Sequence, residues 1–158
     1  MSVISHVCLG TADLARAFPF YAALFDELGL KLRFHEPENG WAGWMPRDAD
    51  RPLLIVGRPW NGQAPDPGNG PMTALTARSR ASVDRCHALA LAAGGTCEGK
   101  PGLRPHYHPA YYGAYFRDLD GNKLCVVCHE PEGDGPEGMR EGPVRCYGRP
   151  AATSLQRT

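Results

Sequence analysis

The stretch that most constrains how this chain can fold is residues 111–129, YYGAYFRDLDGNKLCVVCH. Residues 112–117 are rich in aromatic side chains and residues 124–128 are largely apolar and β-branched, and both compositions are typical of strands. The intervening DLDGN, residues 118–122, has turn chemistry because Gly and Asn accept positive φ angles. The pattern therefore predicts a β-hairpin.

A fainter copy of this pattern lies upstream. The tetrapeptide RDAD at residues 47–50 precedes the apolar run LLIV at residues 53–56. In the same way, RDLD at residues 117–120 precedes KLCV at residues 123–126. The repeated order indicates an internal duplication, which is too long a unit to be a solenoid repeat.

The first half of the chain predicts a strand, a helix and three further strands. The helix carries apolar residues at spacings of three and four and ends at Gly29. We expect its regular part to begin just before Pro19, because proline is tolerated in the first turn and disruptive later. The expected strands are residues 3–9, 30–35, 40–45 and 52–57.

The second half predicts the same order. A helix starts at Ser79 or Ser82 and stops at the Gly94-Gly95 pair. The expected strands are residues 72–77, a strand near residue 96 and the two strands of the hairpin, with a long loop at residues 99–110 before the hairpin.

These elements predict an α+β fold of paired βαβββ modules in one domain. With 158 residues, the chain is long enough for a substantial core. We place the domain at residues 1–130, with modules at 3–58 and 72–129 and a Gly/Pro-rich link between them. Residues 131–158 shift to Gly, Pro and charge, which predicts an irregular tail.

Charge and hydropathy exclude several classes of partner. Lys+Arg and Asp+Glu both number 17, so no basic stripe points to nucleic acid. No apolar run approaches the roughly 20 residues that span a bilayer, and the N-terminus lacks the pattern of a signal peptide. We therefore expect a cytoplasmic protein whose six cysteines are reduced thiols.

The paired modules, with DLDGNK opening the last strand, resemble the vicinal oxygen chelate superfamily. This superfamily includes glyoxalase I, extradiol dioxygenases and bleomycin-resistance proteins, and the resemblance is strongest to its small bacterial glyoxalase-like members. It covers roughly residues 3 to 130. The matching pieces are residues 4–7, 13–14, 20–21, 28–29, 68–70, 83–84, 87, 94–95, 101–105 and 111–129.

The resemblance implies that the modules form a curled mixed sheet around a cavity, with a divalent metal held by residues of the first and last strands of each module. The inherited ligand positions are His6, a residue near Ile55, Met72 and Cys125. The resemblance implies that these side chains line the cavity that binds the small molecule, and we expect those of His6, Met72 and Cys125 to approach one another there. Only His6 is a usual ligand, since Ile55 cannot coordinate and Met72 and Cys125 replace the usual His and Glu. We therefore predict no divalent metal cofactor, with His6 the one retained candidate ligand.

Other interpretations of these positions remain open. His6, Met72 and Cys125 together have the soft donors that suit Cu(I). Cys125 is also a candidate nucleophile with His6 as its base, which requires a lowered thiol pKa. The simplest interpretation is that Met72 and Cys125 fill a site that has lost its metal.

Two further motifs bear on the site. CVVCH at residues 125–129 matches the string for c-type haem attachment, but on a strand Cys125 and Cys128 face opposite sides, which excludes that chemistry.

The loop RPHYHP at residues 104–109 offers donors and aromatic faces over the cavity. Within it and just after it, we expect Arg104, His106 and Tyr111 to contact a ligand, with Arg104 suited to a carboxylate or phosphate.

Three functions fit this sequence. The first is a divergent glyoxalase-like protein that binds a small molecule in its cavity without the usual metal. The second is a metal-dependent lyase or dioxygenase of the glyoxalase or extradiol type. The third is a scaffold whose cavity is filled. In each case family members imply a homodimer, for which exposed sheet edges are available.

Overall fold

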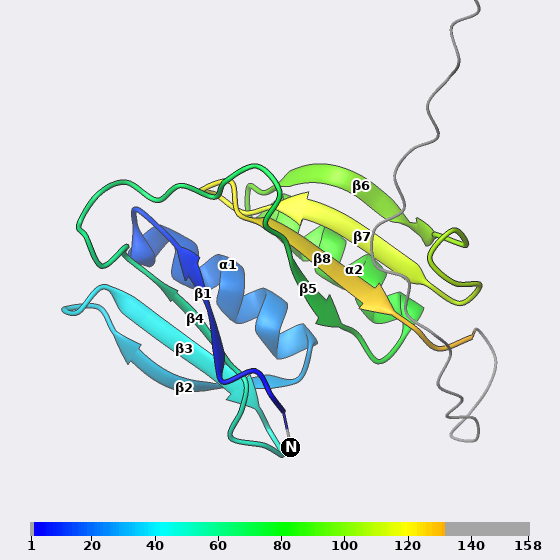
Figure 1. Cartoon of the computed structure of the whole chain (residues 1–158), viewed down its shortest axis with the longest axis horizontal. Coiled ribbons are helices and arrows are strands. Elements are labelled where there is room, and N and C mark those ends of the chain that lie inside the picture. Colours follow the sequence, from blue (N-terminus) through cyan, green and yellow to red (C-terminus); the bar gives the residue numbers. More distant parts are fainter. Residues whose placement is uncertain (1, 132–158) are drawn as a thin grey trace, which may run out of the picture.

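The structure, a computed structural model, describes residues 2–131 (Figure 1). The predicted tail therefore lies, from residue 132 onward, outside the described residues. In chain order the elements are β1 (His6–Gly10), α1 (Leu14–Glu27), β2 (Leu30–Glu36), β3 (Trp41–Pro46), β4 (Leu53–Gly57), β5 (Thr73–Thr76), α2 (Arg80–Ala92), β6 (Thr96–Leu103), β7 (Tyr112–Arg117) and β8 (Lys123–Cys128).

The strands form two four-stranded mixed sheets with the same topology. The first sheet has the order β1-β4-β3-β2 and the second has the order β5-β8-β7-β6. The first pair in each is parallel and the other two pairs are antiparallel. β4 and β8 therefore occupy equivalent places, which confirms the predicted duplication and the α+β class of paired βαβββ modules.

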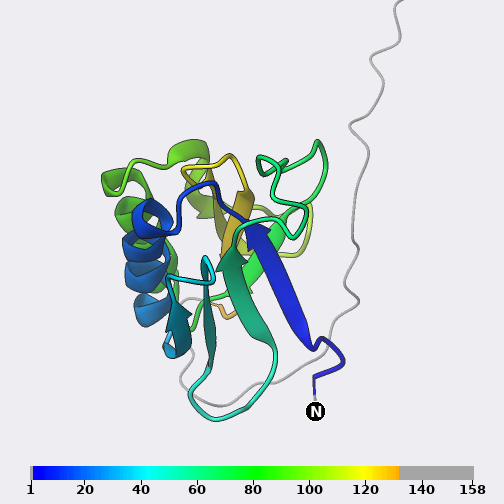
Figure 2. The ribbon, with the colours of Figure 1, turned by 90° about the vertical axis from the view of Figure 1, so that its left-hand side faces the viewer.

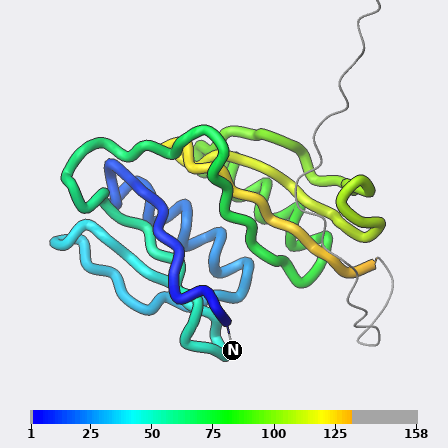
Figure 3. Tube along the Cα trace, in the orientation of Figure 1, coloured from blue at the N-terminus to red at the C-terminus, as the bar shows by residue number. Residues whose placement is uncertain are grey.

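The two modules lie side by side and are joined by the link that crosses from β4 to β5 (Figure 3). Both helices lie on the same side of the strands (Figure 2). Among residues 2–131, neither helix is long and apolar enough to cross a membrane.

Strand β1 begins at His6 and not at residue 3, and two other predicted boundaries differ more. Helix α1 begins at Leu14, because the Asp13 side chain accepts a hydrogen bond from the Arg16 amide and caps the helix there, so Pro19 lies inside it. Strand β6 continues to Leu103 through residues that were predicted as loop. It does so with register shifts around Gly99, which let a Gly- and Pro-containing segment stay paired with β7.

The core lies between the helices and the faces of the sheets that they cover. Strand residues alternate into it, so Leu54 and Val56 of β4 and Leu124 and Val126 of β8 are buried there. The largest side chains that are fully buried in the core are Tyr21, Phe25, Phe116 and Leu24.

The DLDGN turn connects the second module to the first. Asp118 is buried and accepts hydrogen bonds from the Tyr21 hydroxyl (2.5 Å) and from the Asn122 side chain and backbone (2.7 Å each). Asn122 Nδ2 also donates to Gly10 O at 2.8 Å. Burial, and then the Asp118 carboxylate, raise the pKa of Tyr21 well above its usual value, so the hydroxyl stays protonated and donates.

Asp120 makes a second set of contacts across the same junction. Its carboxylate accepts from the Thr11 hydroxyl (2.7 Å) and the Ala12 amide (3.1 Å), and it pairs with Arg16 at 3.4 Å. The turn that identified the hairpin therefore anchors the loop between β1 and α1 of the other module.

Candidate functional site

The candidate site lies on the face of the second sheet opposite the helices, which we call the open face. Leu124, Val126 and Cys128 of β8 belong to the core, whereas Cys125 and Val127 alternate to the open face. This confirms that Cys125 and Cys128 face opposite sides, so the CVVCH string is not a haem attachment site.

Cys125 is covered by tyrosine side chains. Its thiol lies 3.5 Å from the Tyr111 hydroxyl, which accepts a hydrogen bond from the Tyr115 hydroxyl at 3.3 Å. Tyr115 lies directly opposite Cys125 in the pairing of β7 with β8. Cys125 has no exposed surface as a result.

The surroundings of Cys125 oppose ionisation. Burial is the main cause that raises the pKa of the Cys125 thiol, and burial likewise raises the pKa of Tyr111 and of Tyr115. A nucleophilic cysteine needs a lowered pKa. The interpretation of Cys125 as a nucleophile is therefore disfavoured, because the cluster holds a neutral thiol among neutral phenols.

Arg104 is fixed beside these tyrosines by the end of β6. Its Nη1 donates to Leu103 O (3.1 Å) and its Nη2 donates to Lys100 O (2.8 Å). A Cβ atom at Gly102 would lie 2.9 Å from Nη1, so the absence of a side chain at Gly102 makes room for the guanidinium. The Arg104 Cζ atom lies 5.8 Å from the centre of the Tyr115 ring, at the outer range of a cation–π contact.

The segment between β6 and β7, residues 104–111, adds aromatic rings to this cluster. Tyr107 packs against His106 on one side, with ring centres 4.3 Å apart, and against Tyr111 on the other, at 4.8 Å. His108 Nε2 lies 2.7 Å from His129 Nδ1, just beyond β8.

The structure therefore brings together four of the seven predicted site residues: Arg104, His106, Tyr111 and Cys125. The other three lie elsewhere. His6 is exposed on β1 of the first sheet with its Nδ1 3.2 Å from the Ser5 hydroxyl, Ile55 pairs with Cys8 and Gly43 within that sheet, and Met72 is exposed just before β5. No hydrogen bond, ion pair or ring contact among residues 2–131 joins His6 to Met72 or Cys125.

The residues present do not fit the metal centre that the fold family implies. Within the described part of the chain, no three His, Cys, Asp or Glu side chains converge so that they could hold a metal ion. At the inherited positions, the Cys125 thiol is buried under Tyr111 and His6 lies on the other sheet. A divalent ion requires several such donors around one point.

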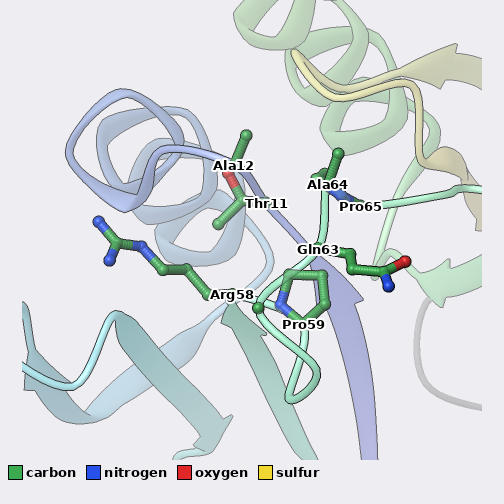
Figure 4. Close-up of a pocket in the computed structure, with 8 residues that line it drawn as sticks. Thr11, Ala12, Arg58, Pro59, Gln63, Ala64 and Pro65 are labelled. Atoms are coloured by element: carbon green, nitrogen blue, oxygen red, sulfur yellow. The ribbon is translucent and has the colours of Figure 1, made fainter.

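Two of the hollows formed by residues 2–131 lie away from this cluster, and none of the seven predicted residues lines either. One, of about 320 Å³, is an apolar groove between the modules, lined by Ile4, Val7, Leu28, Leu30, Pro46, Pro52, Leu54 and residues 73–76. The other, of about 290 Å³, lies between the β1–α1 loop and the start of the link, with Thr11, Arg58 and Gln63 among its lining residues (Figure 4).

Two residues of the cluster, Tyr115 and His129, are not predicted from the sequence. The hairpin register contains the signal for Tyr115, because a turn at residues 118–122 places it opposite Cys125. His129 follows the strand directly, and no local pattern indicates that it meets His108.

A family model described as the Glyoxalase/Bleomycin resistance protein/Dioxygenase superfamily matches residues 3–126. The chain belongs to this superfamily. It is similar over 82% of its length, at 34% identity and a TM-score of 0.70, to the whole of a glyoxalase/bleomycin resistance protein from Albidiferax ferrireducens. No curated protein matches the sequence.

More distant superfamily members share the fold. A glyoxalase-related enzyme from Fulvimarina pelagi is 20% identical, with a TM-score of 0.62, over 81% of this chain and 88% of that one. A lactoylglutathione lyase from Agrobacterium tumefaciens is 22% identical, with a TM-score of 0.55, over 81% of this chain and 94% of that one. At these identities the likeness extends to the fold alone.

Proposed function

We propose that this protein binds a small organic anion on the open face of its second sheet, without a divalent metal at the inherited positions. The observation that carries this proposal is the placement of Arg104, whose guanidinium donates to two backbone carbonyls and lies beside the Tyr115 ring. A positioned guanidinium suits a carboxylate or a phosphate, because its planar fork of donors matches their paired oxygens.

Arg104 keeps donors available for such a ligand. A guanidinium has five N–H groups, and the carbonyls of Lys100 and Leu103 take one each from Nη2 and Nη1. Within residues 2–131 no other acceptor contacts it, and no carboxylate neutralises it. The end of β6 therefore orients the guanidinium, and no carboxylate among the described residues pairs with it, which favours an anionic partner.

The rings beside Arg104 supply an apolar surface for the rest of the ligand. Tyr107 is partly exposed, and its ring is flanked by those of His106 and Tyr111. Aromatic side chains with a few placed polar groups are the usual lining of small-molecule sites. Tyr111 itself fills the space over Cys125, so the ligand binds outside that position.

The alternative function is a metal-dependent lyase or dioxygenase of the glyoxalase or extradiol type. The donor set weighs against it, because only one inherited position keeps a usual ligand and its partners are not grouped around it. The two functions differ in what the purified protein carries. Metal analysis, on protein made without a His tag, therefore separates them.

A binding assay tests the proposal. In calorimetric titrations with a panel of aromatic carboxylates and phosphate esters, we expect at least one compound to bind. Arg104→Gln should lower the affinity for that compound by about tenfold or more, because a hydrogen bond from a charged group contributes about 1.5–3 kcal/mol. The matched control is Arg33→Gln, on exposed β2, which should leave the affinity unchanged.

Two outcomes would count against this function. Equal losses of affinity in both arginine variants would show that the net charge of the protein, and not the guanidinium of Arg104, determines anion binding. Stoichiometric Zn²⁺, Ni²⁺ or Fe²⁺ in the unmodified protein, lost on His6→Ala, would restore the enzyme function. We expect substoichiometric metal that does not change with His6→Ala.

We also propose that the protein is a homodimer. Strands β1, β2, β5 and β6 lie at the ends of their sheets, so each has one backbone edge that no strand of residues 2–131 covers. Ile4 and Met72, beside β1 and β5, are 51% and 39% exposed, which adds apolar surface there. Light scattering coupled to size-exclusion chromatography should give twice the chain mass, and a monomer across the micromolar range would exclude the dimer.

A further inference from the structure

The contact between His108 and His129 ties the segment of residues 104–111 to the end of β8. The two rings are stacked, with centres 5.0 Å apart and planes at 25°, and Nε2 of His108 lies 2.7 Å from Nδ1 of His129. A second tie on the same segment is the contact of Tyr111 with Cys125. Both ties join residues that are distant in sequence.

The hydrogen bonds around the pair indicate which ring nitrogens donate and which accept. The Ala110 amide donates to His108 Nδ1 at 3.2 Å, so this nitrogen is unprotonated. In a neutral His108 the proton is then on Nε2, which donates to His129 Nδ1. These contacts are therefore all satisfied when both rings are neutral, and each contacting nitrogen is then either a donor or an acceptor.

Protonation of either ring breaks one of these contacts. A proton on His129 Nδ1 would face the N–H of His108 Nε2, and a proton on His108 Nδ1 would face the Ala110 N–H. With both rings charged, two cations would also be stacked 5.0 Å apart. The closed arrangement therefore requires neutral imidazoles.

The groups facing the pair do little to stabilise its charge. The Tyr111 ring packs edge-on against both histidines, and its raised pKa keeps it neutral. Burial, and then His108, lower the pKa of His129, and only the neighbouring Glu130 acts in the opposite direction. No carboxylate among residues 2–131 hydrogen-bonds either ring.

We propose that the His108–His129 pair is a pH-sensitive contact that holds Tyr111 over Cys125 at neutral pH and releases residues 104–111 on acidification. The consequence for ligand binding rests on the proposed function, because Arg104 and Tyr111 lie in this segment. The opening itself does not depend on it.

Proton binding by His129 makes the closed segment less stable at acidic pH than at neutral pH. His129 binds a proton less readily when the segment is closed than when it is open and the ring is hydrated. The closed segment therefore has its full stability above the ordinary histidine pKa of about 6.5. That stability decreases as the pH falls from there through the lower pKa that His129 has in the closed segment.

Hydrogen exchange read by mass spectrometry, without ligand, tests the opening. We compare the segment at about pH 7.5 and about pH 5.5, on either side of the histidine pKa, after correction for intrinsic exchange. Protection of the amides of Tyr107 and Tyr111, which donate to Arg104 O and His108 O, should fall about threefold to tenfold at the lower pH. Peptides from α1 should keep their protection, since the opening is local.

Variants assign the effect to the pair. His108→Gln with His129→Asn keeps an amide donor and an amide acceptor near the two ring nitrogens but removes both titrating groups, so the pH effect should disappear. The single variant His129→Asn should reduce it, and His106→Asn, in the same segment, should leave it unchanged.

Three results would overturn this proposal. They are equal protection at the two pH values in the unmodified protein, a pH effect that persists in the double variant, and a pH effect that disappears in His106→Asn. Each is independent of whether any anion binds, so failure of the binding assay does not decide the outcome.

Discussion

Replacing Asp118 by alanine should lower the free energy of unfolding by about 3–5 kcal/mol, as expected when a buried charged hydrogen-bond partner is removed. The Asp118 carboxylate accepts from Tyr21, from Asn122 twice and from the Asp120 amide (3.0 Å), and the residue is only 5% exposed. Without it, these donors lose their acceptor inside the junction between the modules. Urea denaturation followed by circular dichroism measures the loss.

The duplication supplies a matched control for this experiment. Asp48 has the same place in RDAD that Asp118 has in RDLD, yet it is exposed and makes no hydrogen bond within residues 2–131. Asp48→Ala should therefore change the free energy of unfolding by about 0.5 kcal/mol or less. Similar losses in the two variants would show that the contacts of Asp118 do not stabilise the fold.

The two turns also show how far the sequence predicts this fold. Their shared pattern correctly predicts equivalent strands, because strand composition and turn chemistry are local properties. Nothing local predicts that the second turn contacts Thr11 and Gly10 of the first module. These contacts arise from how the modules pack.

The wrong boundaries have local and non-local causes. The start of α1 follows from the Asp13 cap, a signal that the sequence contains and that Pro19 outweighed in the prediction. The extension of β6 to Leu103 has no such signal, because Gly99 and Gly102 have low strand propensity. Pairing with β7 overrides that propensity.

In the candidate site, too, the sequence predicts some of the residues but not the contacts between them. Arg104, His106 and Tyr111 could be selected because they belong to the loop beside the hairpin, and Cys125 because it stands at a ligand position that the family resemblance implies. The covering of Cys125 by Tyr111 depends on how a side chain folds back over the sheet, and the meeting of His108 with His129 joins segments 21 residues apart. Composition and spacing do not determine such contacts.

Replacing Phe116 by alanine should have an effect of similar size, a loss of about 3–5 kcal/mol in the free energy of unfolding, as is typical of Phe→Ala in a core. Phe116 is fully buried on β7, and its ring packs edge-on against Phe20 of α1 and His87 of α2, with both centres 6.4 Å away. The cavity would therefore open where both helices meet the second sheet, which leaves little freedom to collapse. Leu32→Ala, at a side chain 48% exposed on β2, should cost about 1 kcal/mol or less. A loss for Phe116→Ala no larger than this control, measured by urea denaturation at an unchanged m-value, would contradict a tightly packed core at this junction.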